Sequence, residues 1–205
     1  KGVIELVQAV RILRDRGVRV QCLIAGENPR NLTGLKRWIL ERMGLARDVR
    51  AEIESFLSTY HLGDRVRLLG FVEDVISFYR GIDVLVFPSY LDAAGRPVFE
   101  AAFFGVPSVV SISNPPKDSV IDQITGIAIP RPEPEAIARA IERFAEDPGL
   151  LRKMSEEARR WAKERFSIEA NSTRILETYR RLVPPGRSTP DRFRIVFFAH
   201  YFPPL

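Results

Sequence analysis

Cysteine and histidine are scarce in this chain, with one cysteine and two histidines among 205 residues. A single thiol, Cys22, excludes an intramolecular disulfide and a cysteine-rich metal site. Because it lies within the apolar stretch VRVQCLIAG, we expect Cys22 to be a small buried apolar group. His61 and His200 are too far apart in sequence to suggest a zinc site.

The sequence also lacks long apolar runs and blocks of charge of one sign. No apolar run approaches the ~20 residues that a bilayer-spanning helix needs. The first residues, KGVIELVQAVRILRDRG, alternate charged and apolar residues at helical spacing, unlike a signal peptide. We therefore expect a cytoplasmic location, with contact to the inner face of a membrane left open.

The net charge of +5 is spread among interleaved acids and bases, as in RKMSEEARRWAKERF, which predicts solvated helix faces and no nucleic-acid binding.

Six short apolar runs alternate with amphipathic stretches. Uniformly apolar strands are typical of a parallel sheet covered on both faces. Helical spacing is evident between them, for instance in a segment that ends at Asp147-Pro148-Gly149. The alternation predicts an α/β fold, a Rossmann-like doubly wound parallel sheet with helices on both faces. The apolar runs are residues 18–26, 65–72, 83–89, 107–112, 126–130 and 194–200.

One strand-end loop, LDAAGRPVFEAAFFGVP at residues 91–107, has a pattern with chemical meaning. In doubly wound sheets, ligands bind beyond the carboxyl ends of the strands. Gly95 permits close backbone approach, and Pro97 suits the first helical position. Free N–H groups at the helix start, near Arg96 and Val98, are expected to cradle a phosphate.

Two acids, Asp92 and Glu100, lie eight residues apart around this turn. Glu100 is placed one turn into the predicted helix, where a carboxylate can accept hydrogen bonds from a ligand diol such as a ribose. Asp92 lies before the turn, on the opposite side of the predicted phosphate position. With 26 acids in the chain, roughly three pairs at this spacing arise by chance, so the spacing alone is a weak signal.

Several segments match a known family in order, and the ordered set is more specific than any one of them. Together they resemble the donor-binding, C-terminal half of the retaining glycosyltransferases of family 4 (glycosyl transferases group 1), which have the GT-B fold of two Rossmann-like domains. The resemblance implies that residues 1–182 are a nucleotide-sugar-binding domain whose amino end is truncated. The matching segments are KG at 1–2, LIAGENP, DRVRLLGFV, SFYRGIDVLVFPSYLDAAGRPVFEAAFFGVPSVVS, TGIAIPRPEPEAIARAI and RFSIEANSTRILETYRRL.

The resemblance implies roles for the residues that match motif positions. The family's Glu-x7-Glu signature falls on Asp92 and Glu100. Glu100 then binds the ribose of the donor, and Asp92, one methylene shorter than the family's glutamate, is the catalytic residue beside the transferred sugar, which its carboxylate orients or stabilises electrostatically. Ala94 and Pro97 depart from the family pattern. The implied donor-binding residues are Lys1 at the diphosphate, Val72 at the base, the glycine turn at Gly26, and Gly95, Arg96, Val98 and Glu100.

The resemblance also implies an activity, the transfer of a sugar from a nucleotide diphosphate sugar to an acceptor with retention at the anomeric carbon. We expect no metal ion and no other cofactor, because a helix start and a lysine would meet the charge of the leaving group and the sequence has no Asp-x-Asp site. The expected acceptor is a sugar, a lipid-linked sugar or a small molecule, bound through a domain that this chain lacks. The chain alone is therefore expected to be inactive, and peripheral membrane association stays open.

Other interpretations stay open at this stage. Residues 183–192, rich in Pro, Gly and polar residues, are predicted to be a linker. Residues 193–205 resemble the first strand of an acceptor-type Rossmann domain, which indicates a tandem enzyme, a permuted domain order or a misplaced fragment boundary. The alternative function is a non-catalytic nucleotide-binding or interaction module on the same scaffold. A GT-B epimerase or phosphorylase is less favoured by the acid spacing and by the lack of a lysine suited to pyridoxal phosphate.

Overall fold

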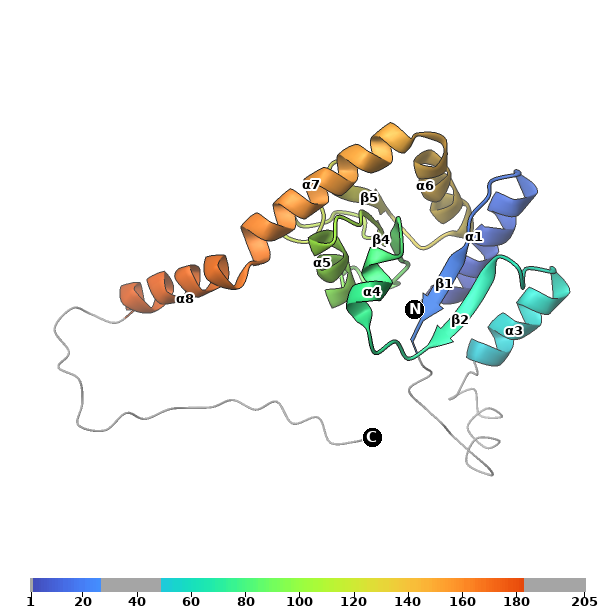
Figure 1. Ribbon diagram of the computed structural model, residues 1–205, viewed down its shortest axis with the longest axis horizontal. Helices are drawn as coiled ribbons and strands as arrows, with labels where there is room; N and C mark the ends of the chain where they lie inside the picture. The colour runs from blue at the N-terminus through green and yellow to red at the C-terminus, as the bar shows by residue number, and fades with distance from the viewer. Residues whose placement is uncertain (1, 27–48, 183–205) are drawn as a thin grey trace, which may run out of the picture. The chain divides into compact units, whose positions relative to one another are not determined.

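A computed structural model describes residues 2–26 and 49–182 of the chain (Figure 1). Residues up to Phe166 form one compact unit, and helix α8 (Ile168–Leu182) belongs to a second. Across the two described ranges, no helix is both long and apolar enough to span a bilayer. Three of the predictions lie outside the described residues: Lys1, the linker 183–192 and the strand 193–205.

Five of the predicted strands are confirmed, and all of their pairings are parallel. In the part of the chain that the structure describes, hydrogen bonds join the strands in two groups, β1 with β2 and β3-β4-β5, with no ladder between the groups. The groups still share a core, because Val20 and Val86 pack against the same apolar cluster. The strands are β1 (Cys22–Ala25), β2 (Val66–Gly70), β3 (Leu85–Phe87), β4 (Ser108–Ser111) and β5 (Gly126–Ile129).

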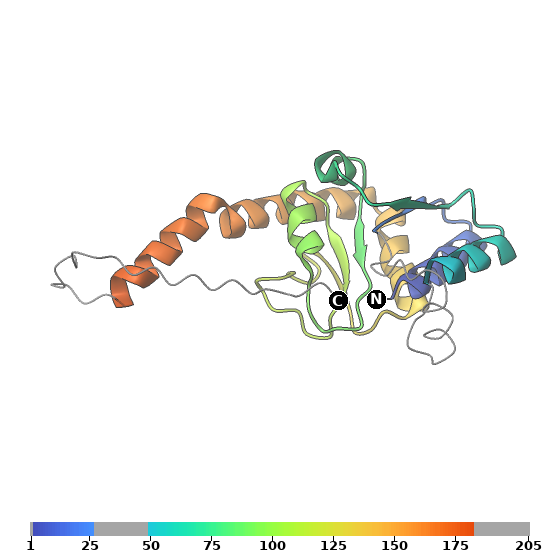
Figure 2. The same ribbon diagram turned by 90° about the horizontal axis from the view of Figure 1, so that it is seen from below.

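Helices alternate with these strands, as the sequence predicts. Helices α1 and α3 lie on the same side of β1 and β2 (Figure 2) and pack against them through one apolar cluster. The predicted break after residue 146 is confirmed, since α6 ends there and α7 begins at Pro148. The helices of this unit are α1 (Val3–Asp15), α3 (Val49–Thr59), α4 (Val75–Arg80), α5 (Arg96–Phe103), α6 (Pro134–Glu146) and α7 (Pro148–Phe166).

Strand β4 is buried on both faces, as a doubly wound sheet requires. Val109 packs into a cluster with Leu13 of α1 and Ile137 of α6. The next residue, Val110, packs instead with Val98 of α5. Because neighbouring residues of a strand point to opposite faces, helices cover both sides of β4. The prediction of a Rossmann-like α/β fold is confirmed in this part of the molecule.

Strand β2 departs from the expectation that each strand is covered on both faces. Val66 and Leu68 pack against α1 and α3, but Arg67 and Leu69 are exposed. The expectation was wrong for β2 because its apolar run is interrupted by Arg67 and buries only alternate residues.

Cys22 of the neighbouring strand packs in the same cluster, and burial raises the pKa of its thiol to about 12. The thiol therefore stays protonated and packs as a small apolar group, although Cys22 is partly buried and not fully buried as expected.

The start of α1 lies against the end of β3. Gly2 has a left-handed backbone (φ 51°), and a Cβ atom at this position would come within 1.9 Å of the carbonyl oxygen of Pro88. Only glycine permits this approach. The contact places the amino end of α1 beside the loop that follows β3, which is the loop with the candidate residues.

Candidate functional site

The loop after β3 runs from Pro88 to Gly95 and is fastened at several points. The hydroxyl of Tyr90 donates a hydrogen bond to Glu5 in the first turn of α1. Within the loop, the N–H of Leu91 donates to Ser89 Oγ over 3.1 Å. The first bond connects the predicted site to the amino end of α1, and the second fixes the loop itself.

Gly95 joins this loop to α5 in a space that admits no side chain. A Cβ atom there would come within 2.5 Å of the Phe87 ring, so the close packing of α5 on β3 requires glycine. Arg96 is the first residue of α5 and Pro97 the second, one position later than predicted. Proline is still tolerated there, because the N–H groups of the first turn lack intrahelical partners.

Val98 differs from the prediction of a free N–H group. Its N–H donates to the Gly95 carbonyl oxygen over 3.0 Å, so this donor is already satisfied within the turn. Its side chain is 1% exposed and packs with Val110 and Ile112. Sequence alone did not reveal this bond, because it depends on the tight bend that Gly95 adopts.

Glu100 lies one turn into α5 with a different partner on each carboxylate oxygen. Oε2 accepts a hydrogen bond from the Tyr79 hydroxyl over 2.9 Å. Oε1 lies 2.9 Å from Nε of Arg96, whose side chain is 87% exposed. Arg96 and Glu100, predicted to take part in one site, are therefore in direct contact.

Tyr79 is a residue of this cluster that the sequence prediction missed. It belongs to α4, is buried, and stands 21 residues before Glu100. Burial raises the pKa of Tyr79, and the hydrogen bond to Glu100 raises it further. Its place in a short apolar helix predicts only a core residue, and no spacing rule relates the two positions.

Asp92 is exposed and is bonded to a neighbouring loop. Its Oδ1 accepts a hydrogen bond from the N–H of Ser113 over 3.1 Å. The Ser113 hydroxyl in turn donates to the Pro130 carbonyl oxygen over 3.1 Å. Asp92 and Ser113 thus join the loops that follow β3, β4 and β5, and among the residues that the structure describes the bonded partners of Asp92 and Glu100 differ.

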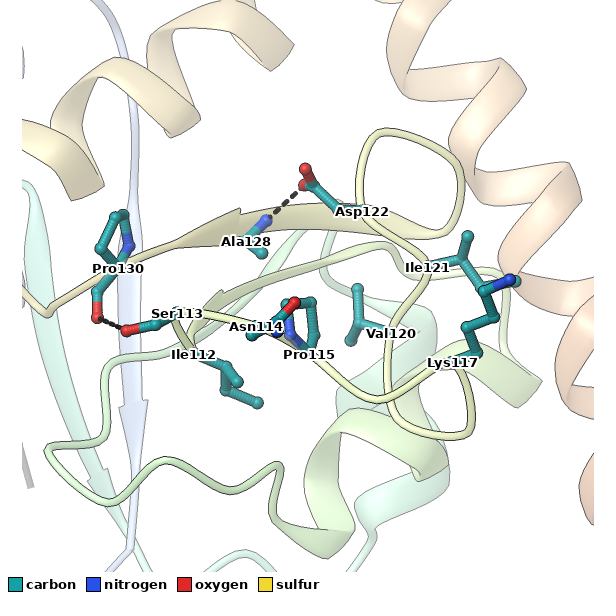
Figure 3. A pocket seen from close by; sticks show the side chains of 10 residues that line it. All are labelled: Ile112, Ser113, Asn114, Pro115, Lys117, Val120, Ile121, Asp122, Ala128 and Pro130. Atoms are coloured by element: carbon teal, nitrogen blue, oxygen red, sulfur yellow. Dashed lines mark hydrogen bonds between the residues drawn. The ribbon is translucent and has the colours of Figure 1, made fainter.

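A pocket of about 330 Å³ opens beside Ser113, between the loop after β4 and the turn before β5 (Figure 3). Asp122 closes one side of it, where its Oδ1 accepts a hydrogen bond from the Ala128 N–H over 2.8 Å. The sequence prediction missed this pocket because its walls are 18 residues apart at their extremes and carry no motif. The lining residues are Ile112, Ser113, Asn114, Pro115, Lys117, Val120, Ile121, Asp122, Ala128 and Pro130.

The predicted residues of β1 and β2 lie at another strand end. Gly26 follows β1 with φ 133°, and its N–H donates to the Gly70 carbonyl oxygen over 2.8 Å. Val72 stands two residues beyond Gly70, so Gly26 and Val72 are brought near each other at the ends of paired strands.

In the two described ranges, no three His, Cys, Asp or Glu side chains gather as a metal site would require.

A parallel α/β domain with its candidate residues at the strand ends is of the Rossmann-like class. Residues 1–161 match the model of the family described as glycosyl transferases group 1. The chain belongs to this family, and the resemblance to the C-terminal domain of a GT-B glycosyltransferase is confirmed.

Individual relatives agree with this assignment. The chain is 26% identical over 169 residues to the capsular polysaccharide biosynthesis glycosyltransferase CapM of Staphylococcus aureus, covering 82% of this chain and 40% of CapM. Sucrose-phosphate synthase from Thermosynechococcus elongatus is 26% identical with a TM-score of 0.66, covering 87% of this chain and 42% of that one. HepE of Anabaena, solved with UDP-glucose, is 18% identical with a TM-score of 0.61, covering 85% and 52%. The chain thus spans about two fifths of the length of CapM.

Proposed function

We propose that this chain is the donor-binding domain of a glycosyltransferase that transfers a sugar from a nucleotide diphosphate sugar with retention at the anomeric carbon. The observation that carries the proposal is the fixed carboxylate of Glu100, one turn into α5 at a strand end where ligands of such folds bind. Family membership and the UDP-glucose bound by HepE, a protein of this fold, support it.

The residues divide between the parts of the donor. Glu100 accepts hydrogen bonds from the ribose diol, and the backbone near Val72 contacts the base. Gly26 lets the backbone approach the ligand, and Gly95, packed on the Phe87 ring, holds the start of α5 at the ligand site. Asp92 lies beside the transferred sugar, where its negative charge stabilises the positive charge that develops at the anomeric carbon.

The diphosphate leaving group gains negative charge as the glycosidic bond breaks. Positive groups already in place lower the barrier of this step. We assign this role to the start of α5 with Arg96 and to the ammonium of Lys1. A helix end contributes about 0.3–1 kcal/mol when exposed and more in a dry cleft. The proposed reaction therefore needs no metal ion and no other cofactor.

The acceptor, a sugar, a lipid-linked sugar or a small molecule, is assigned to a second domain. Transfer requires that domain to close over the donor and exclude water. The chain alone is expected to bind nucleotide and to transfer no sugar. A cytoplasmic location, with or without contact to the inner face of a membrane, fits these substrates, and no role in nucleic-acid binding is proposed.

Calorimetric titration of the full chain with UDP, GDP and ADP tests the donor site. We expect heat of binding for at least one of them. Circular dichroism on the same sample shows whether the protein is folded. A folded sample that binds none of the three contradicts the proposal.

A non-catalytic nucleotide-binding module is the second candidate, favoured by the bond between Asp92 and the Ser113 N–H. In that case Asp92 fastens loops and takes no part in transfer. The two candidates separate in a protein that joins this domain to an acceptor domain. Nucleotide binding without any release of sugar or UDP from UDP-sugar favours the module, and a product with retained configuration by proton NMR favours the enzyme.

A further inference from the structure

Tyr79 is held rigidly beneath Glu100. Its side chain is 5% exposed, and its ring stacks on Phe104 with centroids 5.7 Å apart and planes 16° apart. The Phe78 ring meets it edge-on at 5.7 Å. With the ring fixed by these contacts, the hydroxyl has one direction, and it points at Oε2 of Glu100.

The proton in this hydrogen bond belongs to the tyrosine. A carboxylate oxygen accepts, and a phenol donates as long as it stays protonated. Burial raises the pKa of Tyr79, and the neighbouring Glu100 raises it further. Tyr79 is therefore a donor throughout the neutral range, and a hydrogen bond to an ionised acceptor is among the stronger kinds.

The partner of the other carboxylate oxygen of Glu100, Oε1, is one that a ligand can displace. Oε1 pairs with Arg96, whose side chain is almost fully exposed. Exposed ion pairs within one helix are weak, because water competes for both charges and the long side chain loses freedom. A ligand that offers two hydroxyl groups can therefore replace Arg96 at Oε1, whereas Oε2 stays with Tyr79.

We propose that Tyr79 is a positioning residue that holds Glu100 so that Oε1 faces the ribose diol of a ribonucleoside diphosphate. The inference rests on the proposed function, since it names how the donor-binding carboxylate is aimed. On binding, the diol takes the place of Arg96, and the guanidinium is released towards the diphosphate. Tyr79 itself does not touch the ligand.

The test is calorimetric titration of the full chain with UDP and with 2′-deoxy-UDP. Tyr79→Phe removes only the hydroxyl, so the ring contacts remain. UDP affinity is expected to fall about tenfold, and the preference for UDP over 2′-deoxy-UDP is expected to shrink. Tyr60→Phe is the matched control, because Tyr60 packs on Phe56 in the cluster of α1 and α3, and it should leave both affinities unchanged.

A double-mutant cycle separates positioning from general loss of stability. In a Glu100→Ala background, Tyr79→Phe is expected to cause no further loss of UDP affinity, since the group that it positions is gone. An equal loss in both backgrounds overturns the inference. Thermal melts of each variant show whether any loss reflects unfolding.

Arg96→Met gives a second test that does not disturb the core. The variant leaves Oε1 of Glu100 without its arginine partner, so a ribose diol no longer has to displace that partner. Uridine carries the diol and no phosphate, and its affinity is expected to rise by roughly twofold to fivefold. Unchanged or weaker uridine binding overturns the inference even if Tyr79→Phe fails to fold. Absence of binding to UDP, GDP and ADP by the folded, unaltered chain overturns the proposed function as well, whereas UDP binding that Tyr79→Phe leaves unchanged overturns the role of Tyr79 alone.

Discussion

Glu100 and Asp92 stand on either side of Gly95 in unlike surroundings. Glu100 projects from a helix and is held between a buried tyrosine and an exposed arginine. Asp92 belongs to a loop, is exposed, and is bonded to the backbone of the next strand-end loop. One carboxylate has an oxygen that a ligand can reach by displacing a weak partner. The other carboxylate, that of Asp92, joins two loops of the same chain.

The difference shows that equal charge and a fixed spacing do not give two acids equal roles. A carboxylate with one oxygen bonded to a buried side chain presents its other oxygen in one direction. A carboxylate bonded to a backbone N–H gives that contact up when it turns towards a ligand, which costs about 0.5–1.5 kcal/mol for a typical hydrogen bond. The comparison predicts that nucleotide affinity depends on Glu100 far more than on Asp92.

The largest expected effect is on UDP binding by Glu100→Ala. Loss of a hydrogen-bonded charged group costs about 1.5–3 kcal/mol, which is a tenfold to hundredfold weaker affinity. Asp92→Ala is the matched variant and is expected to change UDP affinity by less than about twofold, because its role concerns the sugar. Calorimetry measures both. Equal losses in the two variants would contradict the distinction.

The next effect concerns Gly95, which separates the two acids. In Gly95→Ala the new Cβ atom would lie 2.5 Å from the Phe87 ring, so we expect a loss of about 1–3 kcal/mol from overpacking. Gly63→Ala is the control, since no atom lies within 4 Å of a Cβ there. Urea unfolding of both variants measures the difference, and comparable stability would show that β3 and α5 can shift apart freely.

A smaller effect is expected at Asp74, which caps the helix that carries Tyr79. Its Oδ1 accepts from the Ser77 N–H over 3.0 Å, and hydrogen bonding from the Ser77 side chain, together with this backbone bond, holds the pKa of Asp74 below its ordinary value of 3.8. Asp74→Ala should lower the melting temperature by about 2–4 °C and weaken UDP binding slightly through Tyr79.

The pH dependence of this cap has a definite sign. Because the pKa is lower in the folded state, the stabilisation is complete above the unfolded value and is lost as the pH falls through the folded one. The difference in melting temperature between the unaltered chain and Asp74→Ala should therefore shrink as the pH falls below the ordinary pKa of 3.8 and through the lower pKa of the folded state. Asp74→Asn, which caps without titrating, provides the control, and a constant difference at all pH values would refute the assignment.

The smallest expected effect is local, at the bond between Asp92 and Ser113. Asp92→Ala should speed hydrogen exchange of the Ser113 amide while leaving global stability nearly unchanged, since an exposed bond contributes at the lower end of roughly 0.5–1.5 kcal/mol. Asp122→Ala removes a similar carboxylate bond at Ala128 and should act there alone. Exchange at Ser113 unaffected by the loss of Asp92 would show that the two loops are held by other contacts.

Much of the fold could be predicted from the sequence, because strands and helices are set by local patterns. Five apolar runs became strands, Gly105 follows the end of α5, and Pro148 begins α7. Family membership followed from the order of the segments, which no single motif provides. The exposed face of β2 was missed because an apolar run does not show which of its residues a helix will cover.

The candidate site was less predictable, since its contacts join residues distant in sequence. The Tyr79 hydroxyl reaches Glu100 only because α4 and α5 pack through the same apolar cluster. The Val98 N–H was predicted to be free, but a backbone bond to Gly95 satisfies it. The pocket beside Ser113 depends on how two loops bend, which no residue pattern reports. The roles of the predicted site residues stay predictions for the titrations above.

Arg16, just after α1, pairs with Glu135 over 2.6 Å and with Glu142 over 2.8 Å, both on α6. The partners are 119 and 126 residues further along the chain. Ala9 and Leu13 of α1 also pack against Ile137 of α6, so during synthesis this side of α1 stays uncovered until α6 has emerged. At ~5–20 residues per second, this delay lasts several seconds or more. The residues of α1 that pack against α6 are thus exposed on the nascent chain for the whole of this delay.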